Sequence, residues 1–587
     1  MNYSDALPEK KFVPNVVIRI GGATYFSIRQ PDSGLTVPAQ NNGLVTSLSL
    51  NPSVVDPFRP SVAINSNSFK LIDRNNAVTT LFNGNLELFQ GELCEIWLGR
   101  VNVGMPFSDY FKVTDTYINK VSRADGSYSF STQEVKDRLN KDVFSEQNKL
   151  GASIIPATTT ITLQSPPASS SGLIKINNEF ISYTGVSGNQ ITGCIRGEQG
   201  STAANHNFGD DVFFCQVVSG NPIDLLLKLL ISPAGGGPYS VLSDGANIDQ
   251  TLVDVAEFEE IRDEYFTGQT FNFILYQIDN LKTFIEQELL SPAGIRLRSN
   301  LNSKIGLGIL NKPVINLDAP DLDDDQLTRR PVYSVDETKI VNHLNIQWGF
   351  DWPSEKFTKI STFIDSPSVA SFGDRKAVNL NFKGITTQAV VDEIAKNYFL
   401  RFAYPKPLID TSAHMSASGW GLLEKPTLVS DQIPTQAGDL NFIDSVEVLQ
   451  RAINYQTGDV RFQLSCTQFT GLRVCFIAPS DTIVSFADQK TVNVGAGRGT
   501  QYRVGWKMRL YDNTTRNWLA DPINTIASIS GDTITFLNNW TTTLVNNAQK
   551  ITFADYDDVT DQQKRFCFIS DDGNNFTDGL PSYLISY

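Results

Sequence analysis

The stretch that most constrains the fold of this chain is residues 172–214, in which short strand-forming runs alternate with Gly, Asn and Ser turns. It closes on Arg196-Gly197, on an Ala-Ala-Asn-His run that ends at His206, and on Gly209-Asp210. Short apolar runs between turn residues are typical of β-strands joined by tight turns, so they predict a small β-module. No catalytic signature elsewhere is as distinctive, and a structural or assembly role is therefore the first expectation.

The length and composition indicate a large β-rich protein. A chain of 587 residues is too long for one hydrophobic core and predicts roughly three to five domains. Apolar residues make up 41% of the chain, while charged residues at 19% fall below the ~25% usual for soluble domains. This low share of charge predicts a surface that is partly covered by partner proteins.

The charge and the terminal residues exclude several classes of protein. A net charge of −15 argues against a nucleic-acid-binding surface, which needs clustered Lys and Arg, although an acidic wall would let DNA slide past without sticking. The longest apolar run, Leu225–Ile231, contains Lys228 and is shorter than the roughly 20 residues that span a bilayer. The opening MNYSDALPEKK lacks the features of a signal peptide, which predicts a chain kept in the cytoplasm until assembly.

Six cysteines are few for this length, and none has a CxxC spacing. The pattern predicts buried, reduced thiols rather than a disulfide framework or a zinc site. They are Cys94, Cys194, Cys215, Cys466, Cys475 and Cys567.

Strand signals dominate both ends of the chain. Turns are expected at Asn83-Gly84, at Pro166–Ser171 and at Thr457-Gly458-Asp459, and a short helix near Gln133–Asn140. Residues 186–192 (VSGNQIT) parallel residues 529–535 (ISGDTIT), which predicts either a duplication or two hairpins of one type. The expected strands are Val16–Ile20, Gly43–Leu50, Leu93–Leu98, Tyr128–Thr132, Thr158–Leu163, Val460–Cys466, Trp506–Tyr511, Thr533–Phe536 and Phe566–Ile569.

Helix signals are confined to the middle of the chain. Asn221 before Pro222 predicts the start of a helix over Ile223–Leu230, and Thr251 with Asp254 predicts a capping box for a helix that ends near Tyr265. Two further helices are expected from apolar residues at helical spacing. One is capped by Asn280 and carries Leu281, Phe284, Ile285 and Leu289; the other follows Thr387 and carries Val390, Val391, Ile394 and Tyr398.

Several strings, in order along the chain, resemble a family of tailed-bacteriophage proteins, the central tail hub or baseplate hub proteins. They are VTSLSLNPSVVDPFRPS, SFKLID, ELCEIWLG, NPIDLLLKLL, VDVAEFEEIRDEYF and FIEQELLSPAG, and the 172–214 stretch resembles a β-module of tail and baseplate proteins. The resemblance covers about residues 12–466. It implies a mainly β, α+β overall, multidomain fold with two tube-like β-barrel domains.

The resemblance also implies how the chain is divided and what it does. The expected domains are a first hub β domain (1–148), an inserted β-module (149–217), a mixed α/β domain (218–345), a second barrel-like domain (346–466) and a C-terminal β domain (467–587). The family forms a homotrimeric ring at the tail tip of the virion, assembled in the bacterial cytoplasm. Its partners are tail-tube, tape-measure and spike or fibre proteins, and phage DNA passes through the channel.

The candidate chemistry is sparse. The three histidines, His206, His343 and His414, accompany no GxSxG elbow and no Cys/His signature, so no Ser or Cys hydrolase is expected. His206 with Asp210 and Asp211 falls short of a typical metal ligand set, which favours a turn or interface histidine.

Two acidic tracts and a glycine-rich tract have plain structural interpretations. One acidic run lacks the spacing of a calcium-binding loop and predicts a solvated linker; it consists of Asp318, Asp321, Asp323, Asp324 and Asp325. For the tract Asp571–Asn575 a turn is the favoured interpretation, and a calcium site is the second one. Gly495-Ala496-Gly497-Arg498-Gly499 lies between expected strands, Thr491–Val494 and Gln501–Val504, and predicts a hairpin tip or partner-binding loop rather than a phosphate loop.

The tryptophans of the second half leave a second class of function open. Most are expected in cores, and Trp420, flanked by small residues, is the one expected to be exposed. A carbohydrate-binding or carbohydrate-cleaving tail component, which would use Trp506, Trp518 or Trp540, is the alternative to the hub, and a peptidoglycan hydrolase is a third. The sequence predicts no catalytic residue, no cofactor and no metal site; host-surface glycan is a possible partner. The tryptophans are Trp348, Trp352, Trp420, Trp506, Trp518 and Trp540.

Overall fold

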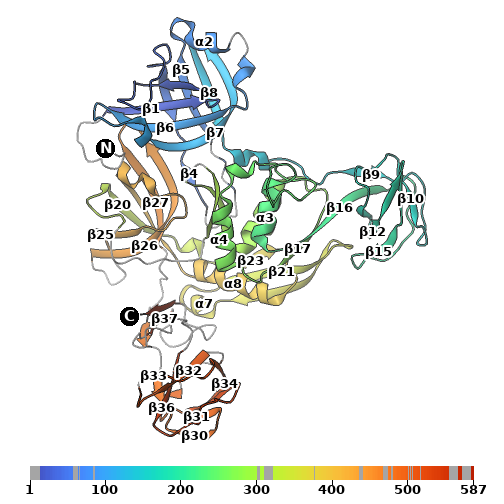
Figure 1. Cartoon of the computed structure of the whole chain (residues 1–587), viewed down its shortest axis with the longest axis vertical. Coiled ribbons are helices and arrows are strands. Elements are labelled where there is room, and N and C mark those ends of the chain that lie inside the picture. The colour runs from blue at the N-terminus through green and yellow to red at the C-terminus, as the bar shows by residue number, and fades with distance from the viewer. Residues whose placement is uncertain are drawn as a thin grey trace. The chain divides into compact units, whose positions relative to one another are not determined.

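The computed structural model contains two compact units, residues 1–468 and 469–587 (Figure 1). The described residues are 13–56, 62, 64, 66–82, 86–300, 304–309, 321–375, 377–434, 440–466, 474–477, 480–499, 502, 504, 507–515, 517–553, 566–570 and 583–586.

The N-terminal region forms a seven-stranded antiparallel sheet, called here the first sheet, in the order β2-β1-β6-β7-β8-β5-β3. Ser27 at the end of β2 bridges Asn42, just before β3, so the two edge strands approach each other and the sheet curls toward a barrel. Alternate side chains, such as Phe69 and Leu71 on β5, point into the core because strand side chains alternate in direction. Its elements are β1 Val13–Ile20, β2 Thr24–Ser27, β3 Val45–Ser49, β5 Ser66–Ile72, η1 Arg74–Asn76, α2 Ala77–Phe82, η2 Leu86–Phe89, β6 Leu93–Val101, η3 Phe107–Asp109, β7 Phe111–Ala124, β8 Ser127–Gln133 and η4 Val135–Leu139.

A second sheet runs in the order β20-β24-β27-β26-β25. Leu322, which precedes β20, bridges Leu428 of β25 at the opposite edge, so this sheet also curls toward closure. The buried residues of the two sheets form one continuous cluster. Because β20 precedes the expected 345/346 boundary, the second sheet draws its strands from both sides of it. Its elements are β4 Ser53–Val54, which pairs with β26, β20 Leu327–Val335, β24 Pro407–His414, η8 Met415–Gly419, β25 Thr427–Pro434, β26 Leu440–Asn454 and β27 Asp459–Cys466.

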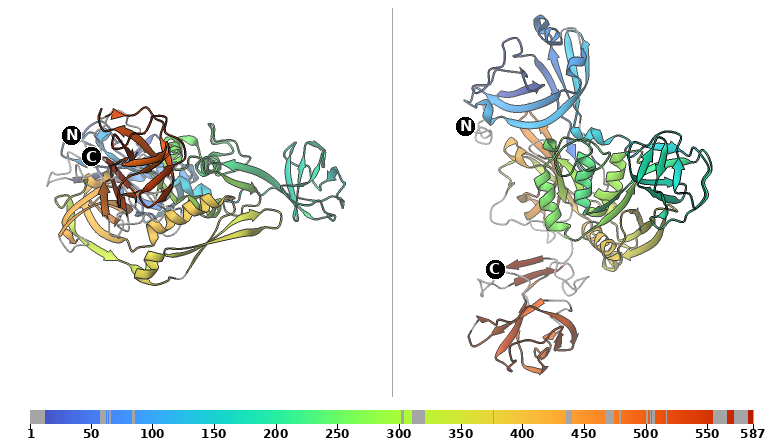
Figure 2. Two further views of the ribbon diagram at one scale, coloured as in Figure 1. Left: turned by 90° about the horizontal axis from the view of Figure 1, so that it is seen from below. Right: turned by 45° about the vertical axis from the view of Figure 1, so that its right-hand side comes forward.

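The expected β-module is present and is joined to the rest of the unit through β16, which pairs with β11 in the module and with β17 outside it (Figures 1 and 2). Its own small core includes Ile161, Ile174 and Ile181. The module consists of β9 Gln147–Lys149, β10 Thr160–Thr162, β11 Gly172–Ile176, β12 Glu179–Tyr183, β13 Gly185–Ser187, β14 Gln190–Thr192, β15 Ile195–Glu198 and β16 Asp211–Gly220.

The helical region between the sheets confirms most of the helix predictions. The side chain of Asn221 accepts a hydrogen bond from Ile223 N, and that of Asn280 accepts one from Thr283 N. The predicted capping box is wrong: Asp254 is the N-cap residue of α4 but makes no side-chain cap, and Thr251 donates instead to Asp249.

Residues of the segment 346–399, expected in the second barrel domain, pack into the core of this helical region. The elements of the region are α3 Pro222–Ile231, η5 Gln250–Leu252, α4 Val255–Tyr265, β17 Phe271–Leu275, α5 Leu281–Ile285, the π-helix η6 Glu286–Leu290, α6 Ser291–Ala293, β18 Ile295–Ser299, β19 Ile305–Ile309, η7 Glu337–Lys339, β21 His343–Asp351, β22 Lys356–Ile364, α7 Ser366–Phe372, β23 Val378–Asn381 and α8 Gln388–Phe402.

The C-terminal unit is all β in its described part, with an eight-stranded and a three-stranded sheet. Gly188 and Gly531 both begin two-residue hairpin turns with positive φ, so the repeated VSGNQIT and ISGDTIT strings are two hairpins of one type. Its strands are β28 Val474–Ile477, β29 Ser480–Thr482, β30 Ser485–Asp488, β31 Thr491–Asn493, β32 Lys507–Asp512, β33 Asn517–Trp518, β34 Asn524–Ser530, β35 Thr533–Phe536, β36 Gln549–Phe553, β37 Phe566–Ser570 and β38 Tyr583–Ser586.

The expected fold class, mainly β and α+β overall with several domains, is confirmed. Across the described ranges, no helix has the length and apolar character needed to cross a membrane. The Asn83-Gly84 turn falls outside the described residues.

Candidate functional site

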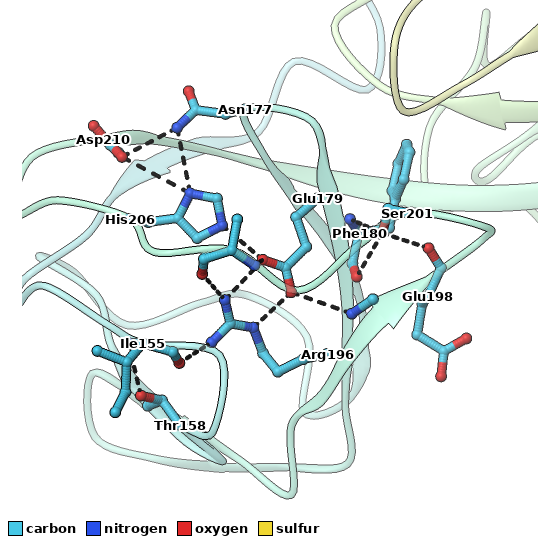
Figure 3. A network of polar contacts seen from close by, with 12 residues as sticks. Ile155, Thr158, Asn177, Glu179, Phe180, Arg196, Glu198, Ser201, His206 and Asp210 are labelled. Carbon is cyan, nitrogen blue, oxygen red and sulfur yellow. Dashed lines mark hydrogen bonds and ion pairs between the residues drawn. The ribbon is translucent and has the colours of Figure 1, made fainter.

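The distinctive stretch of the sequence builds a buried polar network around Glu179 at the start of β12 (Figure 3). Arg196 on β15 binds both carboxylate oxygens of Glu179, with Nε 2.6 Å from Oε1 and Nη2 2.7 Å from Oε2. The side chains of Glu179 and Arg196 are only 1% and 6% exposed. Two parallel hydrogen bonds from a guanidinium to a carboxylate form the strongest common ion-pair geometry in proteins.

Backbone groups complete the coordination of the Glu179 carboxylate. Gly197 N donates to Oε1 at 3.1 Å, and Ala204 N donates to Oε2 at 2.9 Å. Gly197 has φ of +73°, and a Cβ there would lie 3.2 Å from the Ser201 carbonyl oxygen, so this tight turn favours glycine. The Arg196-Gly197 pair is therefore a device that holds the loop after β15 against β12.

His206 is the third side chain on Glu179. Its Nε2 lies 2.7 Å from Oε2 of Glu179, and its Nδ1 lies 3.3 Å from Nδ2 of Asn177. A neutral imidazole with its proton on Nε2 satisfies both contacts. Asn177 also donates to Asp210, whose carboxylate accepts from Asn207 N at 2.9 Å. His206 thus closes the loop from inside, in agreement with the turn histidine expected from the sequence.

The electrostatics of Glu179 point to a fixed, charged acceptor. Burial pushes the pKa of this carboxyl upward, but the hydrogen bonds from Arg196, Ala204 N and His206 outweigh it and leave the pKa below its usual range. A general acid or base needs a pKa near the working pH and a free position for substrate. Both oxygens of Glu179 are already occupied, so the network can hold a loop but offers no free group for proton transfer.

Three exposed apolar residues, from three segments of the module, lie next to residues of the network in the chain or contact it directly. Ile155, whose carbonyl oxygen accepts from Arg196 Nη1 at 2.5 Å, is 62% exposed. Phe208, two residues after His206, is 66% exposed, and Ile195, directly before Arg196, is 57% exposed. Large exposed apolar side chains on a rigid support are typical of contact surfaces.

A second polar cluster ties the module to the β21–β22 hairpin. Lys175 on β11 is buried, forms an ion pair with Glu355 in the hairpin turn, and donates to Tyr276 Oη at 3.1 Å. Its ammonium lies 4.9 Å from the centre of the Tyr276 ring. Glu355 accepts from Tyr276 Oη at 2.7 Å, so the three side chains form a closed triangle.

The acidic run is more ordered than a solvated linker. Asp321 accepts from Thr427 N at 2.8 Å, and Asp324 accepts from Ser430 Oγ at 2.6 Å and from Asp431 N at 2.8 Å. These carboxylates bind the end strand β25 of the second sheet, which corrects the linker prediction. Asp318 and Asp571–Asn575 lie outside the described residues, and within the described ranges no cluster of three potential metal ligands occurs.

The glycine-rich tract of the C-terminal unit is anchored rather than a free hairpin tip. Arg498 forms an ion pair with Asp481 at 2.6 Å, and Gly499 N donates to Asp532 Oδ1 at 3.0 Å. A Cβ on Gly499 would lie 2.0 Å from the Gly531 carbonyl oxygen, so the tract packs against the β34–β35 turn. The strand expected at Gln501–Val504 is not formed at its described residues, Tyr502 and Val504.

The remaining candidates also have structural environments. Trp420, expected to be exposed, is partly buried against the core shared by the two sheets. Trp348 and Trp540 are buried, Trp352 is partly buried, and the side chains of Trp506 and Trp518 lie outside the described residues. His343 lies 3.3 Å from Asp374, and His414 is exposed.

Four cysteines have described side chains, and none of these four forms a disulfide. Cys94, Cys194 and Cys466 are buried and Cys215 is half-buried. Burial raises the pKa of the Cys194 thiol to about 11, so it remains protonated at neutral pH. The prediction of buried, reduced thiols is confirmed for Cys94, Cys194 and Cys466, while Cys215 is reduced but only half-buried.

Sequence reasoning did not find Glu179 and Lys175, the residues that organise the two clusters. Both are charged residues inside apolar strand runs, IKI and EFISY. A charge at a position that alternation places inside a small module is itself a signal of a buried pair. The partner could not be identified from the sequence, because Lys175 and Glu355 are far apart along the chain.

Comparison with known proteins gives structural likenesses only. No protein-family model matches the chain, and no curated protein matches it. Among solved structures it is similar to a tail protein from Neisseria meningitidis MC58 (9% identity, TM-score 0.37, covering 77% of this chain and 96% of that one). It is also similar to prophage tail protein gp18 from Listeria monocytogenes EGD-e (9% identity, TM-score 0.35, covering 77% of this chain and 94% of that one). A third similar structure is the 43 kDa tail protein of prophage MuSo2 from Shewanella oneidensis (8% identity, TM-score 0.34, covering 77% of this chain and 98% of that one).

The solved structures that resemble this chain thus include phage and prophage tail proteins, as the sequence resemblance predicted.

Proposed function

We propose that the chain is a structural virion protein of a tailed bacteriophage that forms the central tail hub as a trimeric ring. The observation that carries the proposal is the pair of curled sheets in one unit, both approaching closure and sharing one core. Three copies would supply six such sheets around an axis. Six sheets in three chains are what a junction between a sixfold tail tube and a threefold tip or spike requires.

The edge strands support assembly with further copies. β22 is the edge of the three-stranded sheet β22-β21-β23, and Ile360 and Ile364 on it are 61% and 51% exposed. On β20, the edge of the second sheet, Val332 and Val335 are 49% and 48% exposed. A long edge strand with exposed apolar side chains favours pairing with another chain.

The proposed ring surrounds the channel used by the tape-measure protein and by DNA. A net charge of −15 favours a wall that repels a polyanion, so DNA would pass without specific binding. The tail-tube proteins and a spike or fibre would be the neighbours on either side of the ring at the tail tip. The inserted module, with its exposed Ile155, Ile195 and Phe208, would face outward and contact fibres or host-surface glycan.

No reaction is proposed. The Glu179 network has no free acceptor, and Trp540, one of the residues on which the glycan alternative depended, is buried in the C-terminal core. Incubation of the purified protein with host polysaccharide and with peptidoglycan tests this directly. Release of oligosaccharide or muropeptide would contradict the purely structural role.

The oligomeric state tests the ring. Native mass measurement is expected to give three times the mass of one chain, and electron micrographs are expected to show a ring. Ile360→Lys on β22 is expected to shift the assembly to monomer, while Ile195→Lys, at a similarly exposed isoleucine of the module, leaves the trimer intact. A monomeric wild-type protein would contradict the hub, and an unchanged trimer in Ile360→Lys would exclude β22 from the interface.

A further inference from the structure

A polar hollow lies where the first sheet, the second sheet and the end of β18 meet. Its lining includes Asn67 of β5, Thr114 of β7 and Arg451 of β26. At this point β4 pairs with β26, with Ser53 opposite Arg451, and Val55 N donates to the Leu449 carbonyl oxygen at 2.8 Å. The hollow therefore lies where the segment that leads from the first sheet pairs with β26 of the second sheet.

Arg451 is the unusual residue of this hollow. Its Nε and Nη2 atoms are buried, and across the described ranges neither has a hydrogen-bond partner. The guanidinium carbon lies 5.4 Å from the centre of the Phe111 ring, so the ring supports the group while its donor edge stays unused. Burial lowers the pKa of Arg451 to about 10, which leaves the side chain charged at neutral pH. A buried charge without a partner is unfavourable, and such a group calls for an anion.

The two unused nitrogens define the shape of that anion. Nε and Nη2 lie on one edge of the planar guanidinium and donate in parallel, which matches two oxygens on a single carbon or phosphorus atom. Two side-chain groups nearby, Nδ2 of Asn67 and the hydroxyl of Thr114, form no hydrogen bond with any described residue. They are available as further donors.

The carboxylate that lines the hollow does not fill this role. Oε2 of Glu134 lies 3.0 Å from the Lys136 ammonium, and Oε1 accepts from Ser299 Oγ at 2.9 Å. Its negative charge is thus balanced by a neighbouring cation. Glu424 raises the pKa of Arg451 electrostatically, but its Oε1 is paired with Arg298 at 3.2 Å and does not reach the Nε–Nη2 edge.

We propose that this hollow binds a small oxyanion of the phosphate or carboxylate type on the Nε–Nη2 edge of Arg451. The bound oxyanion would link the two sheets at their junction and stabilise their mutual packing. The site does not depend on the hub function, since it needs only a dissolved ion. The same chemistry could instead be supplied by an acidic side chain of a second copy, and the test separates these two sources.

The test is thermal unfolding of the full chain in inorganic phosphate against chloride at constant ionic strength. For a ligand that binds only the folded state, the melting temperature of the wild type rises with phosphate concentration. Arg451→Met is expected to lose this rise, and Arg461→Met, at an exposed arginine of the neighbouring strand β27, is expected to keep it. Arg451→Lys keeps a charge but lacks the two-donor edge, and is expected to bind phosphate at least about tenfold more weakly.

Three results would overturn the proposal. The first is a wild-type melting temperature that does not respond to phosphate, and the second is an equal response in Arg451→Met or Arg451→Lys. The third is a melting temperature that depends on protein concentration instead of phosphate, with that dependence lost in Arg451→Met. This last result would assign the guanidinium to a carboxylate of a second copy and exclude the dissolved ion.

Discussion

Arg196 and Arg451 both bury guanidinium nitrogens, but their surroundings are opposite. Arg196 uses its Nε, Nη1 and Nη2 on Glu179 and on the carbonyl oxygens of Ile155 and Ala204. Arg451 leaves Nε and Nη2 without any partner in the described part of the chain. The first arginine completes its own module, and the second requires a group from outside. We call the Arg196 site saturated, because its donors all have partners within the protein, and the Arg451 site unsaturated. A saturated site stabilises the fold, whereas an unsaturated site has donors to which a ligand can bind.

The largest effect is expected from breaking the saturated site. Glu179→Gln removes the negative charge but leaves Arg196 buried, and loss of one partner from a buried pair costs about 3–5 kcal/mol. The free energy of unfolding of the module, followed by hydrogen exchange of β12 and β15, should fall by that amount. Glu198→Gln, at the last residue of β15, serves as the matched control, because Glu198 enters the network through its backbone carbonyl oxygen and the change alters only its side chain. Equal stability of Glu179→Gln and wild type would show that the network does not hold the module.

The opposite sign is expected at the unsaturated site. Arg451→Met removes a buried charge whose Nε and Nη2 have no hydrogen-bond partner among the described residues, and replaces it with an apolar side chain of similar length. In phosphate-free chloride buffer this change should raise the free energy of unfolding by about 2 kcal/mol. Urea unfolding of the unit of residues 1–468 measures this change in free energy, with Arg461→Met as the control for loss of a surface charge. Destabilisation by Arg451→Met in that buffer would mean that the guanidinium already has a favourable environment.

A smaller loss of stability is expected from breaking the ion pair between Lys175 and Glu355. Lys175 is buried, but its partner Glu355 is 53% exposed, so water screens the ion pair. Lys175→Met keeps the aliphatic contact with Tyr276 and should cost about 1 kcal/mol. Faster hydrogen exchange at the β21–β22 turn, with the centre of the module unchanged, would localise the loss. Unchanged exchange at that turn would show that the hairpin is held by aromatic packing alone.

The contrast between the sites also explains what the sequence could predict. The caps at Asn221 and Asn280 and the β-module were predicted because their signals are local: a residue and its neighbours determine the turn. A second barrel-like sheet was implied by the resemblance, but its closure by Leu322 and Leu428 could not be identified from the residues, because it joins segments distant in sequence. Arg451 lies in a run, VLQRAIN, that resembles any strand with outward polar residues. Its burial arises only when β4, from the first part of the chain, pairs beside it.

The smallest effect is expected with pH, and it sharpens the contrast at the saturated site. The pKa of Glu179 is lowered in the folded state, so its ionised form contributes stability above the unfolded pKa, near 4.5, and loses it as the pH falls through the folded value. The stability gap between wild type and Glu179→Gln should therefore be constant from pH 8 to about 5 and narrow below that. Urea midpoints measured at intervals of pH give this gap, since all other carboxyl groups are common to both proteins and cancel. A gap that stays constant down to pH 3 would mean that Glu179 stabilises the module through its shape and hydrogen bonds rather than through its charge.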